Sequence, residues 1–356
     1  MISLILAAAL AADTAPLPEA PSAPRVLTLK AALERAFAKS PAALRAEEEI
    51  KAAEATRLAT RSLVLPRINV TGNLIRNSEE VSFGSAEDSR TILPGTDWST
   101  RITLQQPVYA GRREFRLYSQ AKESVTLARD GKELTLDRLA LRVIADYAAA
   151  VQSQALVDVE KQGAALAEKR IAQAQALFDA GEVTKVDVLR AQTAHRAALR
   201  RVASAEAELI QARSRLRVDL AIDGGDAELG ALDASAEITL PVAGSDSLEA
   251  KALKRPEIRQ AESNLRIAEL EVLKQKGANL PIVTADAGYL RQKSSFPSDG
   301  YGYAALRVTI PVFQGGEVGA RVRVANARRE QADLVVAEAR RQASEDVRQS
   351  LALLEA

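Results

Sequence analysis

Residues 112–178 set the strongest limit on the fold, because they contain no proline and their apolar residues recur at steps of three and four. That spacing marks one face of an α-helix. At 1.5 Å per residue, a helix of this length would be about 100 Å long. Such a rod extends far beyond a globular body. Its apolar face includes Leu136, Leu139, Val143, Tyr147 and Val151.

The sequence predicts that this rod turns back on itself. Phe178, Asp179, Ala180 and Gly181 interrupt the pattern, and a second proline-free helical stretch follows over residues 184–220. Helices over 112–178 and 184–220 would form an antiparallel coiled pair. Alanine dominates their apolar positions, so the two helices can approach closely.

An internal repeat organises the rest of the chain. Helical patterns run over Leu29–Pro66 and Leu248–Pro281, and each is entered through a proline, Pro41 or Pro256. After each pattern the period changes to alternation, and each alternating region ends on a proline, a valine, an aromatic residue, any residue and a glycine. The matched order predicts two copies of one unit, over residues 25–222 and 248–356, joined by a linker over 223–247. The two five-residue endings are Pro107-Val108-Tyr109-Ala110-Gly111 and Pro311-Val312-Phe313-Gln314-Gly315.

The alternating regions predict four strands, because apolar and polar residues alternate along each of them with a period of two. Strands of about ten residues cross a hydrocarbon layer when tilted. One apolar and one polar face suit a barrel with a water-filled lumen. Two soluble hairpins packed on helices would show the same alternation. The attached helices, which are too long for a compact domain, favour the membrane interpretation. The expected strands cover residues 67–76, 97–106, 282–291 and 301–310, and a helix is expected over 28–64.

The first residues and the composition indicate export and exclude several classes of function. Residues 1–24 are interpreted as a signal peptide and leader, although no positive charge precedes Arg25. Lys and Arg (48) nearly cancel Asp and Glu (47), so no basic field exists to hold a nucleic acid. The absence of cysteine excludes disulfides, thiolate metal sites and a cysteine nucleophile.

Three features together resemble the TolC-like outer-membrane efflux proteins. They are the stretch from Leu33 to Ala55, the run from Phe178 to Gln192, and the duplicated plan with its two five-residue junctions. The resemblance covers nearly the whole chain after residue 25. It implies a mainly α fold with a small β part, in which long antiparallel coiled-coil helices form a periplasmic α-barrel. Four membrane strands per chain would contribute to a trimeric, 12-stranded β-barrel in the outer membrane.

The resemblance also implies partners and site residues. A periplasmic adaptor and an inner-membrane pump would dock below the tube, and the helical turn is the expected adaptor contact. Residues 223–247 would match the family's equatorial segment. The expected tip residues are Gly181, Glu182, Val183 and Thr184, and the expected helix-to-barrel junctions are Pro66, Pro107, Gly111, Pro281, Pro311 and Gly315.

The second repeat is shorter than the first. Leu220 lies 109 residues after Gly111, whereas only 41 residues follow Gly315. We therefore expect the chain to be a fragment, a frameshifted gene product or a reduced variant that lacks the second turn and its return helix.

No pattern in the sequence predicts an enzyme, a cofactor or a metal site. His195 is the single histidine and lies mid-helix. The segment 223–226 lacks the alternating ligands of a calcium loop, and the glycine-rich segment 315–319 lacks the lysine of a phosphate loop. The functions left open are an outer-membrane channel subunit, a periplasmic coiled-coil adaptor, a structural coiled-coil protein and a non-functional fragment of the channel.

Overall fold

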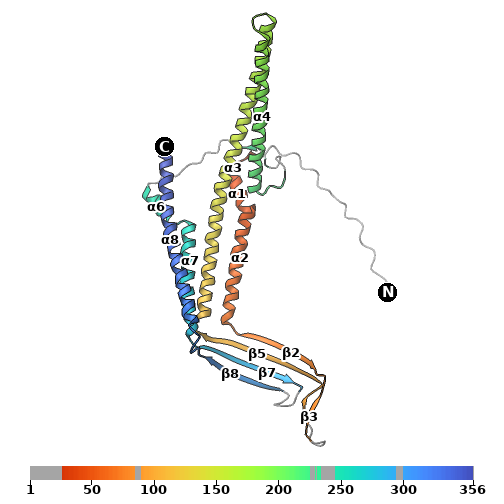
Figure 1. The fold of residues 1–356 in the computed structure, drawn as a ribbon, viewed down its shortest axis with the longest axis vertical. Helices are drawn as coiled ribbons and strands as arrows, with labels where there is room; N and C mark the ends of the chain where they lie inside the picture. The colour runs from red at the N-terminus through yellow and green to blue at the C-terminus, as the bar shows by residue number, and fades with distance from the viewer. Residues whose placement is uncertain are drawn as a thin grey trace, which may run out of the picture. The chain divides into compact units, whose positions relative to one another are not determined.

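A computed structural model describes residues 26–84, 90–224, 229, 231–233, 245–293 and 300–355 (Figure 1). The expected leader over 1–24 and most of the expected linker over 223–247 lie outside the described residues. The helices are α1 (Leu29–Lys39), α2 (Pro41–Arg61), η1 (Ser62–Val64), α3 (Arg113–Asp179), α4 (Lys185–Asp219), α6 (Ser245–Ala252), α7 (Pro256–Lys276), η2 (Gly277–Asn279) and α8 (Glu317–Glu355). The strands are β1 (Val26–Leu27), β2 (Arg67–Arg76), β3 (Val81–Phe83), β4 (Arg90–Leu93), β5 (Thr96–Ala110), β6 (Ala231–Leu232), β7 (Ile282–Gln292) and β8 (Gly300–Thr309).

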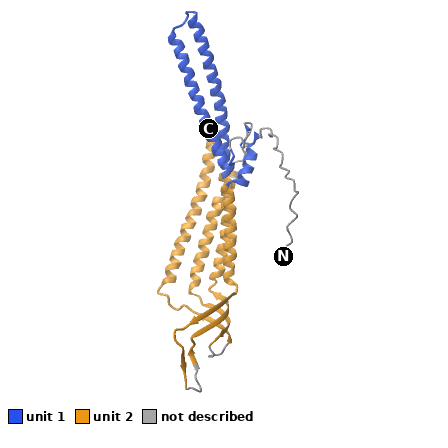
Figure 2. Cartoon of the chain, turned by 90° about the vertical axis from the view of Figure 1, so that its right-hand side faces the viewer, with its two compact units in different colours: residues 1–40, 139–239 blue, residues 41–138, 240–356 orange. Residues whose placement is uncertain are grey.

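The chain divides into two compact units (Figure 2). Unit 1 comprises residues 1–40 and 139–239, and unit 2 comprises residues 41–138 and 240–356. Helix α3 contributes to both units, and unit 2 holds the long strands of both sequence repeats. Both predicted repeats therefore contribute residues to unit 2.

The helix expected over residues 28–64 is broken, which corrects the sequence prediction. Helix α1 ends at Lys39, Ser40 has φ −58° and ψ 133°, and Pro41 begins α2. A proline disfavours helical conformation in the residue before it, and its own missing N–H is tolerated in the first helical turn. The second repeat has the same break, because Arg255 has φ −58° and ψ 149° before Pro256 begins α7.

Four strands form one antiparallel sheet in unit 2, in the order β2-β5-β7-β8 (Figure 1). The strand expected over 67–76 has the same bounds as β2, and the other three differ from their predicted bounds by four residues or fewer. The pairing of β5 with β7 joins the two repeats. Its register shifts between Pro107 and Tyr109, where proline has no N–H to donate. A short hairpin of β3 and β4 lies within the longer loop of the first repeat.

The two hairpins repeat one register. Arg67 pairs with Gln105 in the first hairpin, and Ile282 pairs with Thr309 in the second. Aligning Pro66 with Pro281 and Gly111 with Gly315 makes these two pairs equivalent. Each hairpin also follows a short 3-10 turn, η1 or η2, that ends two residues before the first aligned proline. The duplication read from the sequence is therefore a structural duplication.

Polar bridges connect the helices of unit 2. Arg259 of α7 donates to Asp130 of α3 at 2.9 Å and also pairs with Glu133. Gln120 of α3 donates to the carbonyl oxygen of Ile267 at 3.1 Å and to Glu271 at 2.9 Å. A small apolar cluster joins α6, α7 and α8 through Ala252, Ile258 and Ala343, with Ala339 and Val347 packed against it.

The core of unit 1 is the seam between α3 and α4, which is built from residues seven apart. That period is the one that keeps an apolar stripe on the seam of a left-handed coiled pair. On α3 the buried series is Val143, Ala150, Val157 and Ala164, and on α4 it is Ala198, Ala205 and Ala212. None of the described helices is long and apolar enough to cross a membrane.

Two glycines meet where β5 passes into α3. Gly111 has φ +64°, and a Cβ atom there would lie 2.1 Å from the carbonyl oxygen of Gly277. Gly315 is the equivalent residue of the second repeat and has φ +57°, but nothing lies within 4 Å of its Cβ position. The residue after each glycine is also left-handed, with φ 59° at Arg112 and 81° at Gly316.

This difference between equivalent glycines predicts unequal costs of substitution. Gly315→Ala should lower the free energy of unfolding of the monomeric chain by about 1 kcal/mol, because only the left-handed backbone is penalised. Gly111→Ala should lose a further ~1–3 kcal/mol, since the added methyl group forces the Gly277 backbone to shift. Urea unfolding of the detergent-solubilised monomer measures both. Equal losses would show that the close approach of Gly111 to Gly277 does not matter.

Candidate functional site

The four-stranded sheet of unit 2 has one apolar and one polar face. The register pairs Ile68 with Leu104, Ile102 with Tyr289, and Ala285 with Leu306, so apolar side chains lie opposite one another across every strand. The intervening positions form the other face, where Asn69 lies opposite Thr103 and Gln105 opposite Asp286. The alternation in the sequence is therefore carried coherently across all four strands.

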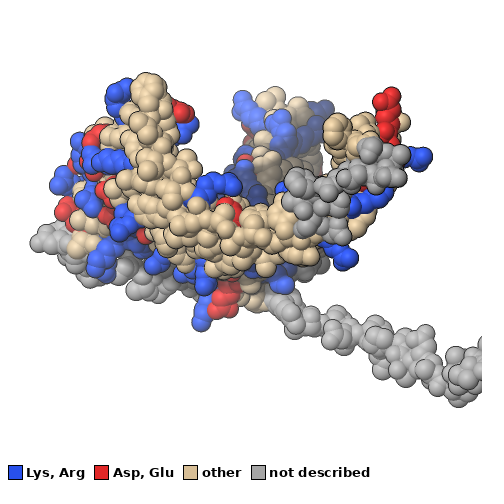
Figure 3. Space-filling model, turned by 90° about the horizontal axis from the view of Figure 1, so that it is seen from below, with Lys and Arg blue, Asp and Glu red and all other residues tan. Residues whose placement is uncertain are grey.

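The apolar face of the sheet is exposed in the single chain. Ile68, Leu74 and Leu306 are 70%, 77% and 67% exposed. Figure 3 shows the strand end from below, where most of the visible surface carries neither Lys or Arg nor Asp or Glu. An exposed apolar face of this extent marks a surface that contacts another protein or a membrane.

The polar face carries an ion pair and a close contact between a tyrosine ring and a glycine. Arg307 of β8 lies 3.8 Å from Asp286 of β7, whose side chain is nearly buried. The ring of Tyr303 covers Gly288, where a Cβ atom would lie 2.6 Å from the ring. Among the described residues of the sheet, charged residues also occur on the opposite face, but only near the ends of its strands, at Arg76 and Arg291.

The edge strand β8 is followed by a different structure from its central equivalent β5. Residues 106–110 of the first repeat continue β5 and pair with β7 through Ala110 and Ile282. The equivalent residues 310–314 follow β8 without forming a strand. Val312 and Phe313 are 92% and 88% exposed, so the second five-residue junction presents a bare apolar segment.

The turn between α3 and α4 forms a tip in unit 1. Gly181 has φ +78°, the left-handed conformation that glycine adopts without strain. The N–H of Gly181 donates to the carbonyl oxygen of Phe178 at 2.9 Å, and that of Glu182 to Leu177 at 2.9 Å, which closes the end of α3. Glu182 is exposed and Val183 is half-buried.

A capping box begins the return helix α4. Both the N–H and the hydroxyl of Thr184 donate to the carboxylate of Asp187, at 3.1 Å and 2.7 Å. The hydroxyl of Thr184, then its N–H, then Arg190 lower the pKa of Asp187 below its ordinary value. A spacing of threonine, two residues and an acidic residue is a sequence signature of this cap.

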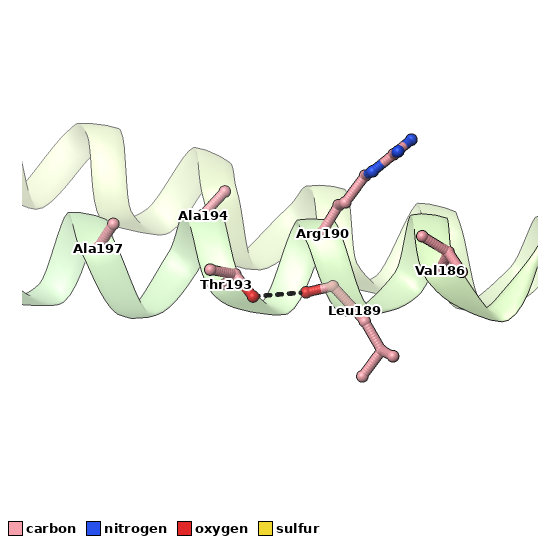
Figure 4. A pocket seen from close by; sticks show the side chains of 6 residues that line it. All are labelled: Val186, Leu189, Arg190, Thr193, Ala194 and Ala197. Carbon is pink, nitrogen blue, oxygen red and sulfur yellow. Dashed lines mark hydrogen bonds between the residues drawn. The ribbon is translucent and has the colours of Figure 1, made fainter.

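A shallow groove of about 460 Å³ lies on α4 beside the tip (Figure 4). Its residues follow one helical face at steps of three and four, and Val186 and Leu189 are 53% and 51% exposed. Thr193 donates its hydroxyl proton to the carbonyl oxygen of Leu189 at 2.8 Å, so the polar group is satisfied and the groove stays largely apolar. The lining residues are Val186, Leu189, Arg190, Thr193, Ala194 and Ala197.

The structure brings the predicted residues together in two places. The four tip residues form one turn between α3 and α4. The predicted junction residues all lie in unit 2: Pro107 is inside β5, and Pro66, Gly111, Pro281, Pro311 and Gly315 lie between one and six residues outside the strands. No group of three or more His, Cys, Asp or Glu residues that could hold a metal ion occurs within the described ranges.

Sequence reasoning missed three parts of these sites. Asp187 carries a signal that could have been read, because it stands three residues after the predicted tip residue Thr184. Gly277 could not have been found in the same way, since its role depends on the approach of Gly111. The groove on α4 appears only once the buried face of the helix is known.

The chain matches the family described as outer membrane efflux protein over residues 32–220 and 248–356. These ranges are most of the chain, and it belongs to that family. A curated relative is the outer membrane efflux protein BepC of Brucella suis biovar 1 (strain 1330), which is 24% identical over 248 residues. The match covers 67% of this chain and 54% of BepC, so the chain spans about half the length of this relative.

Solved structures share the fold. A membrane protein from Pseudomonas aeruginosa matches with a TM-score of 0.77 and 17% identity, over 91% of this chain and 73% of that chain. CusC matches with a TM-score of 0.76 and 17% identity, over 91% and 75%. The outer membrane protein VceC of Vibrio cholerae matches with a TM-score of 0.73 and 16% identity, over 92% and 79%.

The capping box predicts how the tip responds to mutation and to pH. Thr184→Val should increase amide hydrogen exchange in the first turn of α4, whereas Thr184→Ser should keep the hydroxyl contact and leave the exchange unchanged. The lowered pKa of Asp187 means that its contribution is present above the ordinary range of aspartate and is lost only in stronger acid. Equal exchange in the Val and Ser variants would contradict the capping role.

Proposed function

We propose that this chain is a channel subunit of the outer membrane that exports substrates within a tripartite efflux or type I secretion system. The observation that carries the proposal is the register of β2, β5, β7 and β8, which collects apolar side chains on one face and polar ones on the other. Membership of the outer membrane efflux protein family supports the same conclusion.

The dimensions of the sheet fit a hydrocarbon layer. The four strands have 10, 15, 11 and 10 residues, and a tilted membrane strand needs about 9–11. The exposed side chains of Ile68, Val70 and Leu306 would face lipid, and Arg101 and Arg307 would line the aqueous side.

An open sheet in lipid would require partners for its edges. Each unpaired backbone group in hydrocarbon costs on the order of several kcal/mol, so β2 and β8 would have to pair with further strands. Other copies of this chain supply them most simply, because β5 already pairs with β7 in the way that β8 would pair with β2 of the next copy. Three copies of four strands would give the 12-stranded barrel that the family resemblance implies.

The internal duplication predicts a register for this contact. Within the chain, Gln105 pairs with Asp286. Their equivalents under the aligned repeats are Thr309 and Thr71, so Thr309 of one copy should lie opposite Thr71 of the next. The same correspondence brings Phe313, which is 88% exposed, to Ile68, which is 70% exposed, and would cover both.

The tip would contact a periplasmic adaptor, which in turn would connect the channel to an inner-membrane pump. Gly181, Glu182, Val183 and Thr184 form the turn, and the apolar groove that begins at Val186 continues from it along α4. A groove lined at helical spacing is suited to a partner helix that inserts its own apolar face.

Channel function is tested by conductance. The purified chain, reconstituted into planar lipid bilayers, should give discrete conductance steps, and it should fractionate with outer membranes and need detergent for release. A chain released in soluble form by washing, with no conductance, would contradict the proposal.

A disulfide test checks the contact between copies, and the chain suits it because it contains no cysteine. Residues opposite one another on antiparallel strands have Cα atoms about 4.5–5.5 Å apart, within the range of a disulfide. Thr71→Cys combined with Thr309→Cys should form covalent oligomers on oxidation of outer-membrane extracts. Asn73→Cys combined with Thr309→Cys, displaced by two residues, is the matched control. Equal crosslinking in the two pairs would exclude the predicted register.

A charge and size test checks the adaptor contact. Glu182→Lys combined with Val183→Trp should weaken crosslinking to the adaptor while leaving assembly of the strands intact, because both residues lie at the turn. Glu208→Lys, an exposed position farther along α4, is the matched control. If the tip variant crosslinks as the parent does, the tip only reverses the chain.

A further inference from the structure

The seam between α3 and α4 contains one carboxylate where its pattern requires an apolar side chain. Counting seven residues from Ala198 gives Ala205, Ala212 and then Asp219, the last residue of α4. The three alanines are buried, and Asp219 is buried with them, at 7% exposure. A charge at such a position is costly unless it is fully paired.

The pairing of Asp219 is incomplete. One carboxylate oxygen, Oδ1, lies 3.5 Å from Nη1 of Arg142 on α3, at the outer limit of a hydrogen bond. The other oxygen, Oδ2, is buried and has no hydrogen-bond donor. An ionised carboxylate can only accept, so this oxygen is left without a partner as long as Asp219 is charged.

A second carboxyl group faces the first. Asp146 is half-buried and lies on α3 one helical turn after Arg142, so it shares the helix face from which Arg142 contacts Asp219. Two neighbouring carboxylates that are both ionised repel one another. A proton placed on either carboxyl group supplies the donor that both lack, as in other carboxyl pairs that share a proton.

Two other polar side chains at this end of the seam make hydrogen bonds of their own. Arg35 of α1 donates to the carbonyl oxygens of Leu220 and Ala221, at 3.1 Å and 3.5 Å. The hydroxyl of Tyr147, next to Asp146 in the sequence, donates to the carbonyl oxygen of Leu27 or Asp233, at 2.7 Å and 3.0 Å. These contacts attach α1, β1 and β6 to the α3–α4 seam beside the carboxyl pair.

We propose that Asp146 and Asp219 form a shared proton site. When a proton occupies it, the packing of α3 against α4 at the C-terminal end of α4 becomes more stable. The packing at this point therefore depends on pH. The protonated pair is hydrogen-bonded and neutral, whereas the ionised pair weakens the attachment of α1, β1 and β6. This inference does not depend on the proposed export function, because it concerns only the described residues of unit 1.

The direction of the pH effect follows from the environment of Asp219. Burial first, and then the Asp146 carboxyl, raise the pKa of Asp219 to about 6, although Arg142 acts in the opposite direction. The folded chain therefore holds this proton more tightly than the unfolded chain does. The stabilisation is fully present below the ordinary pKa of aspartate and is lost as the pH rises through about 6.

Hydrogen exchange of the full chain tests the proposal locally. Peptides covering residues 139–150 and 212–222, corrected for intrinsic exchange rates, should be about tenfold better protected at about pH 5 than at about pH 7.5. Asp219→Asn, a neutral residue of the same shape, should be as protected at both pH values as the parent is at the lower one. Asp146→Asn should shift the midpoint of the pH dependence downward, because it removes one of the causes that raise it.

The matched control is Asp158→Asn, an exposed position on the same helix, which should keep the pH dependence of the parent. Protection that does not vary with pH in the parent would overturn the proposal. So would an Asp219→Asn chain that is less protected than the parent at about pH 7.5, because the neutral residue should then tighten the seam.

Discussion

The antiparallel pairing of β5 with β7 is the contact on which the rest of unit 2 depends. It joins the two sequence repeats, and its register aligns the apolar positions of one hairpin with those of the other. A slip by one residue would exchange the two faces along the whole of β7 and β8. The same pairing brings the end of β5 beside the start of β7, where only glycine fits at positions 111 and 277. This pairing therefore determines which side chains lie on each face of the sheet, which strands are left at its edges, and where α3 begins.

In unit 1, the close packing of α3 against α4 depends on alanine. The small residues Ala150, Ala198 and Ala205 are buried in the seam, which allows α3 and α4 to pack closely over many turns. Each buried alanine contributes little apolar area, whereas larger buried side chains gather at the end that holds Asp219, namely Leu139, Val143, Leu216 and Leu220. Asp219 has a large local effect because these buried apolar side chains keep water away from its carboxylate.

Periodicity and proline placement predicted much of this fold, and the missed parts have physical causes. The period of two over residues 67–76 gave the bounds of β2, and the proline-free stretch gave α3 to within one residue, because both patterns are local. The break at Ser40 was missed although the signal, Pro41, was present. The pairing of β1 with β6 and the contact of Gly111 with Gly277 could not have been predicted, since each joins segments more than 150 residues apart. The tip was located from the sequence, but its capping box was missed and its groove depends on which face of α4 is buried.

The central claim is that one face of the sheet contacts lipid and the other contacts water, and spin labels placed singly along β8 test it most directly. In reconstituted vesicles, labels at Ala304, Leu306 and Val308 should be more accessible to oxygen dissolved in the lipid. Labels at Tyr303, Ala305 and Arg307 should be more accessible to a water-soluble nickel complex. Accessibility to oxygen and accessibility to the nickel complex should each alternate along β8 with a period of two residues, and the two should be out of phase. Uniform exposure of all six labels to the nickel complex would contradict this claim.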